Sequence, residues 1–261
     1  MLWARVSTLN DADCPNSDFA AKESSVTRTK PIVAIDGPAG AGKSTVARRV
    51  ADALGYTLVD TGAMYRAIAL AAEKKGVAWS DGPGLGALAQ SLLDADAVSF
   101  TANRADPSKG VTVTLYGEDV SSAIRTPELG LGASSVSAHP EVRAALLELQ
   151  RRAGREGAVV LEGRDIGTVV FPEAEVKFFL TATPEVRARR RCDELLAKGQ
   201  AVTFEDTLRD VVKRDEQDTG RKIAPLKQAE GAILVDSSHL SFEDTVGVML
   251  EHVKRVSEKM A

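Results

Sequence analysis

Cysteines and histidines are few in the 261-residue sequence, and an excess of basic residues is missing. The two cysteines, Cys14 and Cys192, have no neighbours with metal-ligand spacing, so we expect free thiols in a reducing cytoplasm. The three histidines are scattered, and we expect them at the surface or at helix caps. The sequence therefore indicates neither a disulfide-bonded scaffold nor a cysteine–histidine metal site.

Charge and hydropathy exclude two further kinds of partner. The formal net charge is −4, so we expect no basic surface for a nucleic acid or a membrane. No apolar run approaches the roughly 20 residues of a membrane-spanning helix, and the N-terminus lacks the basic-then-apolar pattern of a signal peptide. Small molecules are the expected partners, and a monomer is the expected state.

The most informative segment present is a glycine-rich loop between an apolar run and a helical pattern. Residues 32–36 (IVAID) lead into GPAGAGKS at 37–44, which matches G-x-x-x-x-G-K-[ST]. Glycines let the backbone wrap a phosphate, Lys43 reaches the outer phosphates, and the Ser44 hydroxyl ligates Mg²⁺. The predicted ATP-binding residues here are Gly37, Pro38, Ala39, Gly40, Ala41, Gly42, Lys43, Ser44 and Thr45. The alternative is a glycine-rich turn in an unrelated loop, which the agreement of strand, loop and helix disfavours.

Short apolar runs alternate with helical patterns along the chain. The runs are 32–36, 57–60, 158–162, 176–181 and 232–236. Unalternated runs between helices predict an α/β fold with a parallel sheet covered on both faces, and ligands at the carboxyl ends of its strands. In the helix after the glycine-rich loop, we expect the buried stripe to consist of Val46, Val50, Ala53 and Leu54.

Length and composition predict a single α/β domain over residues 30–261. Residues 1–29 are small and polar without periodicity, so we expect a disordered tail or a misassigned start. Residues 96–120 predict a small antiparallel insertion around a turn at 103–110.

Two motifs at predicted strand ends indicate a second substrate. In DTGAMYR at 60–66, Thr61 and Arg66 offer a hydroxyl and a guanidinium to a phosphate. In GRDIG at 163–167, Arg164 and Asp165 place a cation and a carboxylate together. The alternative for the second motif is an Arg–Asp pair that stabilises a turn.

The helical pattern at 204–220 turns from an apolar stripe into charges. Positions with spacings of three and four are Leu208, Val211, Arg214, Asp218 and Arg221. Burying such charges without partners costs roughly several kcal/mol, so they pair among themselves or meet a ligand. The alternative is an i, i+4 pair of Arg214 with Asp218 on a solvated face.

A second helical pattern begins at Thr183-Pro184 and carries four arginines. Arg187 and Arg191 form a like-charge i, i+4 pair, which an anion or the acids at 193 and 194 would relieve. The functional hypothesis is a mobile flap that closes over the triphosphate, and the alternative is a solvated helix face.

The number of arginines indicates two phosphorylated substrates, because a guanidinium grips phosphate in a planar, bidentate manner. Those expected near the loop are Arg66, Arg143, Arg164, Arg187, Arg190, Arg214 and Arg221. A nucleoside monophosphate also explains why no catalytic base is evident, since its attacking oxygen is already anionic.

At this point the sequence resembles the bacterial cytidylate kinase (CMP/dCMP kinase) family. The matching blocks are 35–45, 60–66, 117–120, 124–126, 161–172 and 214–226, in order along the chain. The resemblance implies a nucleoside monophosphate kinase fold with a parallel sheet, a monophosphate-binding region at about 62–130 that carries the small β insertion, and a lid at about 183–200. It implies ATP-dependent phosphorylation of CMP and dCMP with Mg²⁺.

The resemblance also implies roles for individual residues. The CMP phosphate would contact Arg66, Arg164 and Arg221, and the ribose Arg214 and Asp218. Cytosine would meet Ser134, Arg143 and Asp165, with Thr61 and Tyr65 nearby. The implied catalytic residues are Lys43, Arg164, Arg190 and Arg221, and the implied lid contacts to ATP are Arg187 and Arg190. Glu162, often Asp in the family, is a second candidate for Mg²⁺ through water, and Thr61 stands where serine is common.

Two other classes of function compete with this hypothesis. A kinase for a hydroxylated metabolite would use Asp60 or Asp165 as its base and would leave the arginines unexplained. A nucleotide-dependent switch of the GTPase kind would carry an N-K-x-D motif, which this sequence lacks. A relative that only binds nucleotide is disfavoured because Lys43, Ser44 and the arginines are all present.

Overall fold

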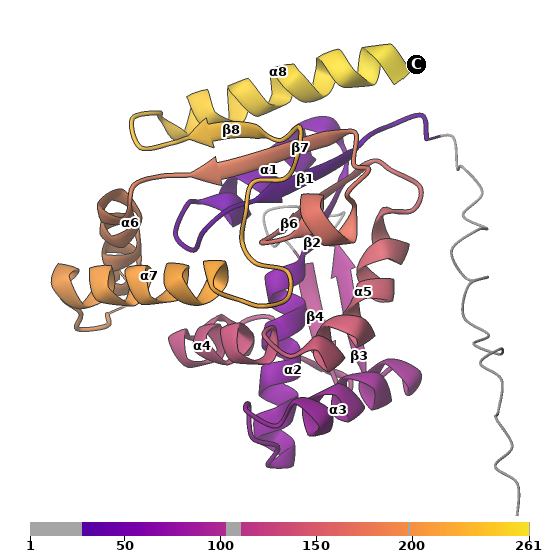
Figure 1. Cartoon of the computed structure of the whole chain (residues 1–261), viewed down its shortest axis with the longest axis vertical. Helices are drawn as coiled ribbons and strands as arrows, with labels where there is room; N and C mark the ends of the chain where they lie inside the picture. The colour runs from indigo at the N-terminus through magenta and orange to yellow at the C-terminus, as the bar shows by residue number, and fades with distance from the viewer. Residues whose placement is uncertain (1–27, 103–110, 198, 261) are drawn as a thin grey trace, which may run out of the picture.

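The computed structural model describes residues 28–102, 111–197 and 199–260 (Figure 1). Cys14, most of the predicted tail and the turn at 103–110 lie outside the described residues. Within them, five parallel strands form the central sheet in the order β2-β6-β1-β7-β8. The prediction of an α/β fold with a parallel sheet is therefore confirmed.

The sheet strands lie within one residue of the predicted runs. They are β1 (Ile32–Asp36), β2 (Thr57–Asp60), β6 (Val159–Gly163), β7 (Val176–Thr181) and β8 (Ile233–Asp236). Ala158 was expected in β6, but its φ of 51° is outside the extended region, so the strand begins one residue later. β1 is the central strand, and all of its residues are buried, which explains its uninterrupted apolar sequence.

Helices flank the sheet. α1 (Lys43–Leu54) packs against α8 (Phe242–Met260), while α2 (Thr61–Lys75) and α5 (Pro140–Gly154) pack against β6. The expected buried stripe of α1 is wrong at Ala53, which is exposed. The buried side of the helix instead includes Val46, Ala47, Val50 and Ala51, and Ala53 points away from it. No described helix has the combination of length and apolar character that crossing a membrane requires.

A second, antiparallel sheet lies beside the main one. It consists of β3 (Val98–Ala102), β4 (Val111–Leu115) and β5 (Glu118–Asp119), in that order. Alternate β4 residues are fully buried, as expected for a sheet with one face on a core. α3 (Gly82–Asp94), the 3₁₀ turn η2 (Ala123–Arg125) and α4 (Pro127–Val136) complete this part of the molecule.

Two further helices, α6 (Pro184–Ala197) and α7 (Phe204–Thr219), pack against each other. Figure 1 shows them together at one side of the molecule, next to the end of β7. The five-residue π-helical turn η3 (Ile166–Val170) follows β6 and contacts β1. The ends of β1, β2 and β6 thus face the starts of α1, α2 and η3, where ligands of such sheets bind.

Candidate active site

The glycine-rich loop joins β1 directly to α1, as its sequence predicts. Gly37 has a φ of 150°, and a Cβ on it would lie 1.9 Å from the Leu180 carbonyl oxygen, so only glycine fits there. Gly42 is the N-cap of α1 in the left-handed conformation and makes no side-chain cap. The first N–H groups of α1 are therefore available to an anion.

Lys43 lies inside this loop with 6% of its surface exposed. Its Nζ donates to the Pro38 carbonyl oxygen at 2.7 Å, so the ammonium folds back over the loop backbone. Burial, and then the positive charge of Arg164, lower the pKa of Lys43 well below its usual value. A phosphate anion at this position would favour the charged ammonium that the protein alone disfavours.

Ser44 and Glu162 meet at the predicted metal position. The Ser44 hydroxyl donates to Glu162 Oε2 at 2.8 Å, and Glu162 Oε1 is buried with no hydrogen-bond partner among the described residues. Burial, followed by the negative charge of Asp60, raises the pKa of Glu162. A hydroxyl and a carboxylate with a free buried oxygen are hard oxygen ligands that fit Mg²⁺.

The described residues contain no group of three or more His, Cys, Asp or Glu side chains that could hold a metal ion. Mg²⁺ usually takes only one or two protein carboxylates and completes its shell with phosphates and water. The Ser44–Glu162 pair therefore suits a metal that arrives with a nucleotide.

The start of α2 holds Thr61 and Arg66 next to Glu162. Thr61 Oγ1 donates to the Glu162 carbonyl oxygen at 2.7 Å, and Asp60 caps the helix by accepting from the Ala63 N–H at 2.9 Å. Asp60 also pairs with Arg125 at 2.8 Å, a residue to which the sequence assigned no role. Burial raises the pKa of Asp60, but Arg125 and Arg66 outweigh it and hold the pKa below its ordinary value.

Three arginines, Arg164, Arg214 and Arg221, act on one buried carboxylate, that of Asp218. Asp218, at 1% exposure, accepts from Arg164 Nε at 2.7 Å and also pairs with Arg221. The alternative of an Arg214–Asp218 pair on a solvated face is wrong, because Asp218 is buried and takes these other partners. The alternative of an Arg164–Asp165 pair within the turn is also wrong, because Arg164 pairs with Asp218 and Asp165 pairs with Arg143.

The positive charge of this group is not fully neutralised. Arg66 Nη1 and Arg214 Nε are buried without hydrogen-bond partners among the described residues. Burial, and then the charge of Arg164, lower the pKa of Arg214 to about 10. A buried guanidinium nitrogen without an acceptor costs free energy, which an anion placed there would recover.

Arg143 and Asp165 form an ion pair between α5 and the turn after β6. Arg143 Nη1 also donates to the Ser137 carbonyl oxygen at 3.3 Å, and the guanidinium carbon lies 5.9 Å from the centre of the Tyr65 ring. Burial raises the pKa of Asp165, although Arg143 opposes the shift. Ser134, the third residue expected here, is buried in α4, and its carbonyl oxygen accepts from the Ser137 hydroxyl at 3.1 Å.

Arg187 of α6 does not lie on a solvated helix face. It is 3% exposed, and its guanidinium donates to the Ala182 carbonyl oxygen at 2.8 Å and to the Ala39 carbonyl oxygen of the phosphate loop at 3.0 Å. The same group pairs with Asp215 of α7 through contacts of 3.0 and 2.5 Å. A solvated helix face is therefore wrong at Arg187, and in this structure its donors are used by the protein.

The neighbouring arginines of α6 are also accounted for. Arg190 donates to the hydroxyl and the carbonyl oxygen of Ser237, at 3.0 and 2.8 Å. Arg191 pairs with Glu194 at 2.8 Å, so an acid of the same helix relieves the predicted like-charge contact. In this structure Arg187 thus links α6 to the phosphate loop and α7, and Arg190 links α6 to the segment after β8.

Sequence reasoning missed three residues of this region. Arg125 pairs with the α2 cap Asp60, Asp215 pairs with Arg187, and Asp36 accepts from the Ile166 N–H next to Asp165. Asp36 had one available signal, an acid at the end of a buried strand. Nothing in the local pattern distinguishes Arg125 or Asp215 from surface residues.

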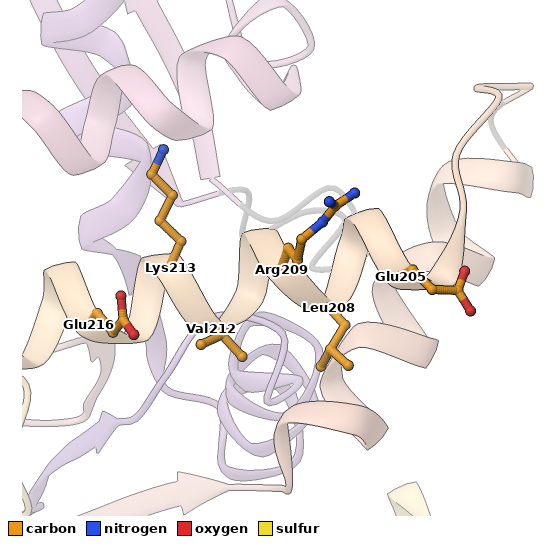
Figure 2. Close-up of a pocket in the computed structure, with 6 residues that line it drawn as sticks. All are labelled: Glu205, Leu208, Arg209, Val212, Lys213 and Glu216. Carbon is orange, nitrogen blue, oxygen red and sulfur yellow. The ribbon is translucent and has the colours of Figure 1, made fainter.

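A depression on α7 lies apart from this site. It is lined by Glu205, Leu208, Arg209, Val212, Lys213 and Glu216, all from that helix (Figure 2). In Figure 2 Leu208 and Val212 point to one side of the helix, and Arg209 and Lys213 to the other. None of the predicted site residues lines this depression, so it does not change the location of the candidate site.

Comparison with known proteins assigns the family. The family model for cytidylate kinase matches residues 33–255. The cytidylate kinase of Geobacter sp. (strain M21) is 52% identical over 223 residues, which cover 85% of this chain and 92% of that protein. The cytidylate kinase of Neisseria gonorrhoeae (strain ATCC 700825 / FA 1090) is 48% identical over 225 residues, covering 86% of this chain and 98% of that protein. A phosphate loop followed by converging arginines, together with similarity over most of both chains, places this protein in the cytidylate kinase family.

Proposed function

We propose that this protein transfers the γ-phosphoryl group of ATP to CMP and dCMP and so forms CDP and dCDP. The observation that carries the proposal is the buried arginine group beside Lys43, in which Arg66 Nη1 and Arg214 Nε have no acceptor among the described residues. Two phosphate-bearing substrates explain why cations of the phosphate loop and of this group are buried side by side.

The phosphate loop would hold ATP. N–H groups of residues 37–45 would cradle the β-phosphate, and Lys43 would leave the Pro38 carbonyl oxygen for the β- and γ-phosphates. Ser44 and Glu162 would hold Mg²⁺, which when bound supplies neutralisation of phosphate charge. Arg187 and Arg190 of α6 would contribute once they exchange their present protein acceptors for phosphate oxygens.

The arginine group would hold CMP by its phosphate and sugar. Arg66, Arg164 and Arg221 would grip the phosphate, and Arg164 and Arg221 are already oriented by Asp218. Arg214 and Asp218 would reach the ribose. Both substrates' phosphates would then be neutralised in a site from which water is excluded, where electrostatic stabilisation of the transition state is strongest.

The Arg143–Asp165 pair would select cytosine, with Ser134, Thr61 and Tyr65 around the base. Cytosine has an amino donor at C4 beside acceptors at N3 and O2, so a carboxylate accepts from the first and a guanidinium donates to the others. Uracil presents an acceptor and a donor in the first two places, and each mispaired group costs about 1–3 kcal/mol. Asp165 and Arg143 therefore discriminate between the two bases.

A kinase for a neutral hydroxyl fits this site less well. Such an enzyme needs a carboxylate that accepts a proton, and Asp60 caps α2 and pairs with Arg125. Asp165, the other candidate base, is paired with Arg143. The monophosphate of CMP needs no base, because its oxygen is already anionic. We also expect the protein to be a monomer, which light scattering tests. We expect it in the cytoplasm, which cell fractionation tests.

The test is a coupled ADP-release assay with Mg·ATP and each of CMP, dCMP, UMP, AMP and GMP. We expect turnover with CMP and dCMP alone, and Asp165→Ala should raise the KM for CMP far more than that for ATP. Glu148→Ala, which changes an exposed acid on α5, is the control. Similar turnover of UMP or AMP contradicts the base assignment, and no turnover with any of the five contradicts the proposed reaction.

A further inference from the structure

Asp36 connects the phosphate-loop strand to the turn that carries Asp165. It is the last residue of β1, directly before Gly37, and is 2% exposed. Its Oδ1 accepts from the Ile166 N–H at 2.8 Å, and its Oδ2 accepts from the Gly167 N–H at 2.8 Å. One carboxylate thus holds two consecutive N–H groups that lie 130 and 131 residues further along the chain.

These two N–H groups begin the π-helical turn η3, where N–H groups lack partners within the turn itself. An aspartate at the N-cap position ordinarily satisfies such groups with its own side chain. Asp165 occupies that position, with a φ of −149° and a ψ of 24°, yet its side chain makes no cap hydrogen bond. Its carboxylate instead pairs with Arg143 of α5.

We infer that Asp36 is a positioning residue for cytosine recognition, because it caps η3 in place of Asp165 and leaves the Asp165 carboxylate directed at Arg143 and the base. The inference rests on the proposed function of the Asp165–Arg143 pair. It assigns Asp36 no contact with either substrate.

The surroundings of Asp36 support this role. Asp36 lies opposite Gly163 in the parallel register of β1 and β6, so the turn 163–167 folds over the end of its strand. Asp165 and Lys43 are the charged groups that act on it, and burial raises the pKa of Asp36 to about 6. Burying a carboxylate costs free energy. Its two oxygens here accept from two N–H groups, whereas a neutral amide has only one oxygen and could accept from only one of them.

The test compares kinetic constants of Asp36→Asn with those of the unaltered protein. Asparagine keeps one acceptor and turns an N–H₂ group toward the other N–H, so Asp165 becomes the better cap and leaves the base. We expect the KM for CMP to rise about tenfold, the loss of roughly one good hydrogen bond, and the preference for CMP over UMP to fall by a similar factor. The KM for ATP should change little.

Glu175→Gln is the matched control. Glu175 Oε2 accepts from the Ile32 N–H at 2.8 Å, at the opposite end of the same strand. If the carboxylates at the two ends of β1 have a purely structural role, both variants should have similar effects. Equal increases in the KM for CMP and ATP in Asp36→Asn, or the same increase in KM for CMP in Glu175→Gln, overturn the inference.

A double variant tests whether Asp36 acts through Asp165. In an Asp165→Ala background, Asp36→Asn should have almost no further effect on the KM for CMP, and additive losses overturn the inference. If Asp36→Asn does not fold, hydrogen exchange of the unaltered protein replaces it. Without nucleotide, the amides of Ile166 and Gly167 should be as protected as those of β6, and protection that requires CMP overturns the inference.

These outcomes are distinct from a failure of the proposed function. An unaltered protein that does not phosphorylate CMP contradicts the proposed function itself. Normal CMP kinase activity together with a kinetically unchanged Asp36→Asn removes only the role of Asp36.

Discussion

Asp218→Asn tests how much the protein stabilises its own arginine group before a substrate binds. The side chain of Asp218 is 1% exposed, and its partners Arg164 and Arg221 are 20% and 8% exposed. Removing one member of a buried ion pair costs about 3–5 kcal/mol, since it leaves the other charge uncompensated. Because Arg164 keeps partial contact with solvent, we expect the lower end of that range.

The expected loss corresponds to a clear change in the midpoint of thermal unfolding. For a chain of this size about 3 kcal/mol lowers the midpoint by roughly 6–12 °C. Differential scanning fluorimetry without nucleotide measures it. The control is Glu251→Gln, which removes an exposed i, i+4 pair with Arg255 that contributes about 0.5 kcal/mol or less.

Sulfate provides a second measurement on the same variant. With Asp218 neutral, Arg164, Arg214 and Arg221 lose the carboxylate that balances their charge, and an anion replaces part of it. Sulfate should therefore raise the unfolding midpoint of Asp218→Asn more than those of the unaltered protein and of Glu251→Gln. A loss within about 1 °C of the control, or equal effects of sulfate on all three proteins, would refute a buried, charge-balanced arginine group.

Three other changes have defined outcomes. Gly37→Ala should cost soluble expression or several degrees of unfolding midpoint more than Gly42→Ala, since both have positive φ but only the first Cβ meets a backbone oxygen, at 1.9 Å. Burial raises the pKa of Asp36 to about 6 in the folded protein. Above that pH the buried charge therefore lowers the stability, and this loss disappears as the pH falls and Asp36 becomes protonated. Urea unfolding measures this loss. Between about pH 7 and pH 4, the stability relative to Asp36→Asn should rise by roughly 2 kcal/mol, and a flat difference contradicts the shift. Arg187→Lys should lower the unfolding midpoint and raise the KM for ATP, because one ammonium cannot replace the guanidinium's contacts with Ala182, Ala39 and Asp215. Arg191→Lys, at a half-buried position where the arginine pairs within α6, should match the unaltered protein in both assays.

Local sequence patterns determined the sheet and the phosphate loop. β1 is apolar throughout because it is central and buried on both sides, and the loop after it needs glycines at positions with positive φ or close backbone contacts. Such features depend on residues within one element, so spacing and residue type suffice to find them. Even there, Ala53 shows that the exact buried side of a helix depends on what packs against it.

Only the tertiary structure decided which charges meet. Arg164 pairs with Asp218, 54 residues away, rather than with its neighbour Asp165, and Asp165 pairs with Arg143, 22 residues earlier. Asp36 reaches N–H groups 130 residues further along. Partners of a long charged side chain depend on distances across the fold and on burial, which no pattern within one segment specifies. The sequence thus determined that cations gather at the ends of these strands, and the fold decided which are neutralised and which are left for a phosphate.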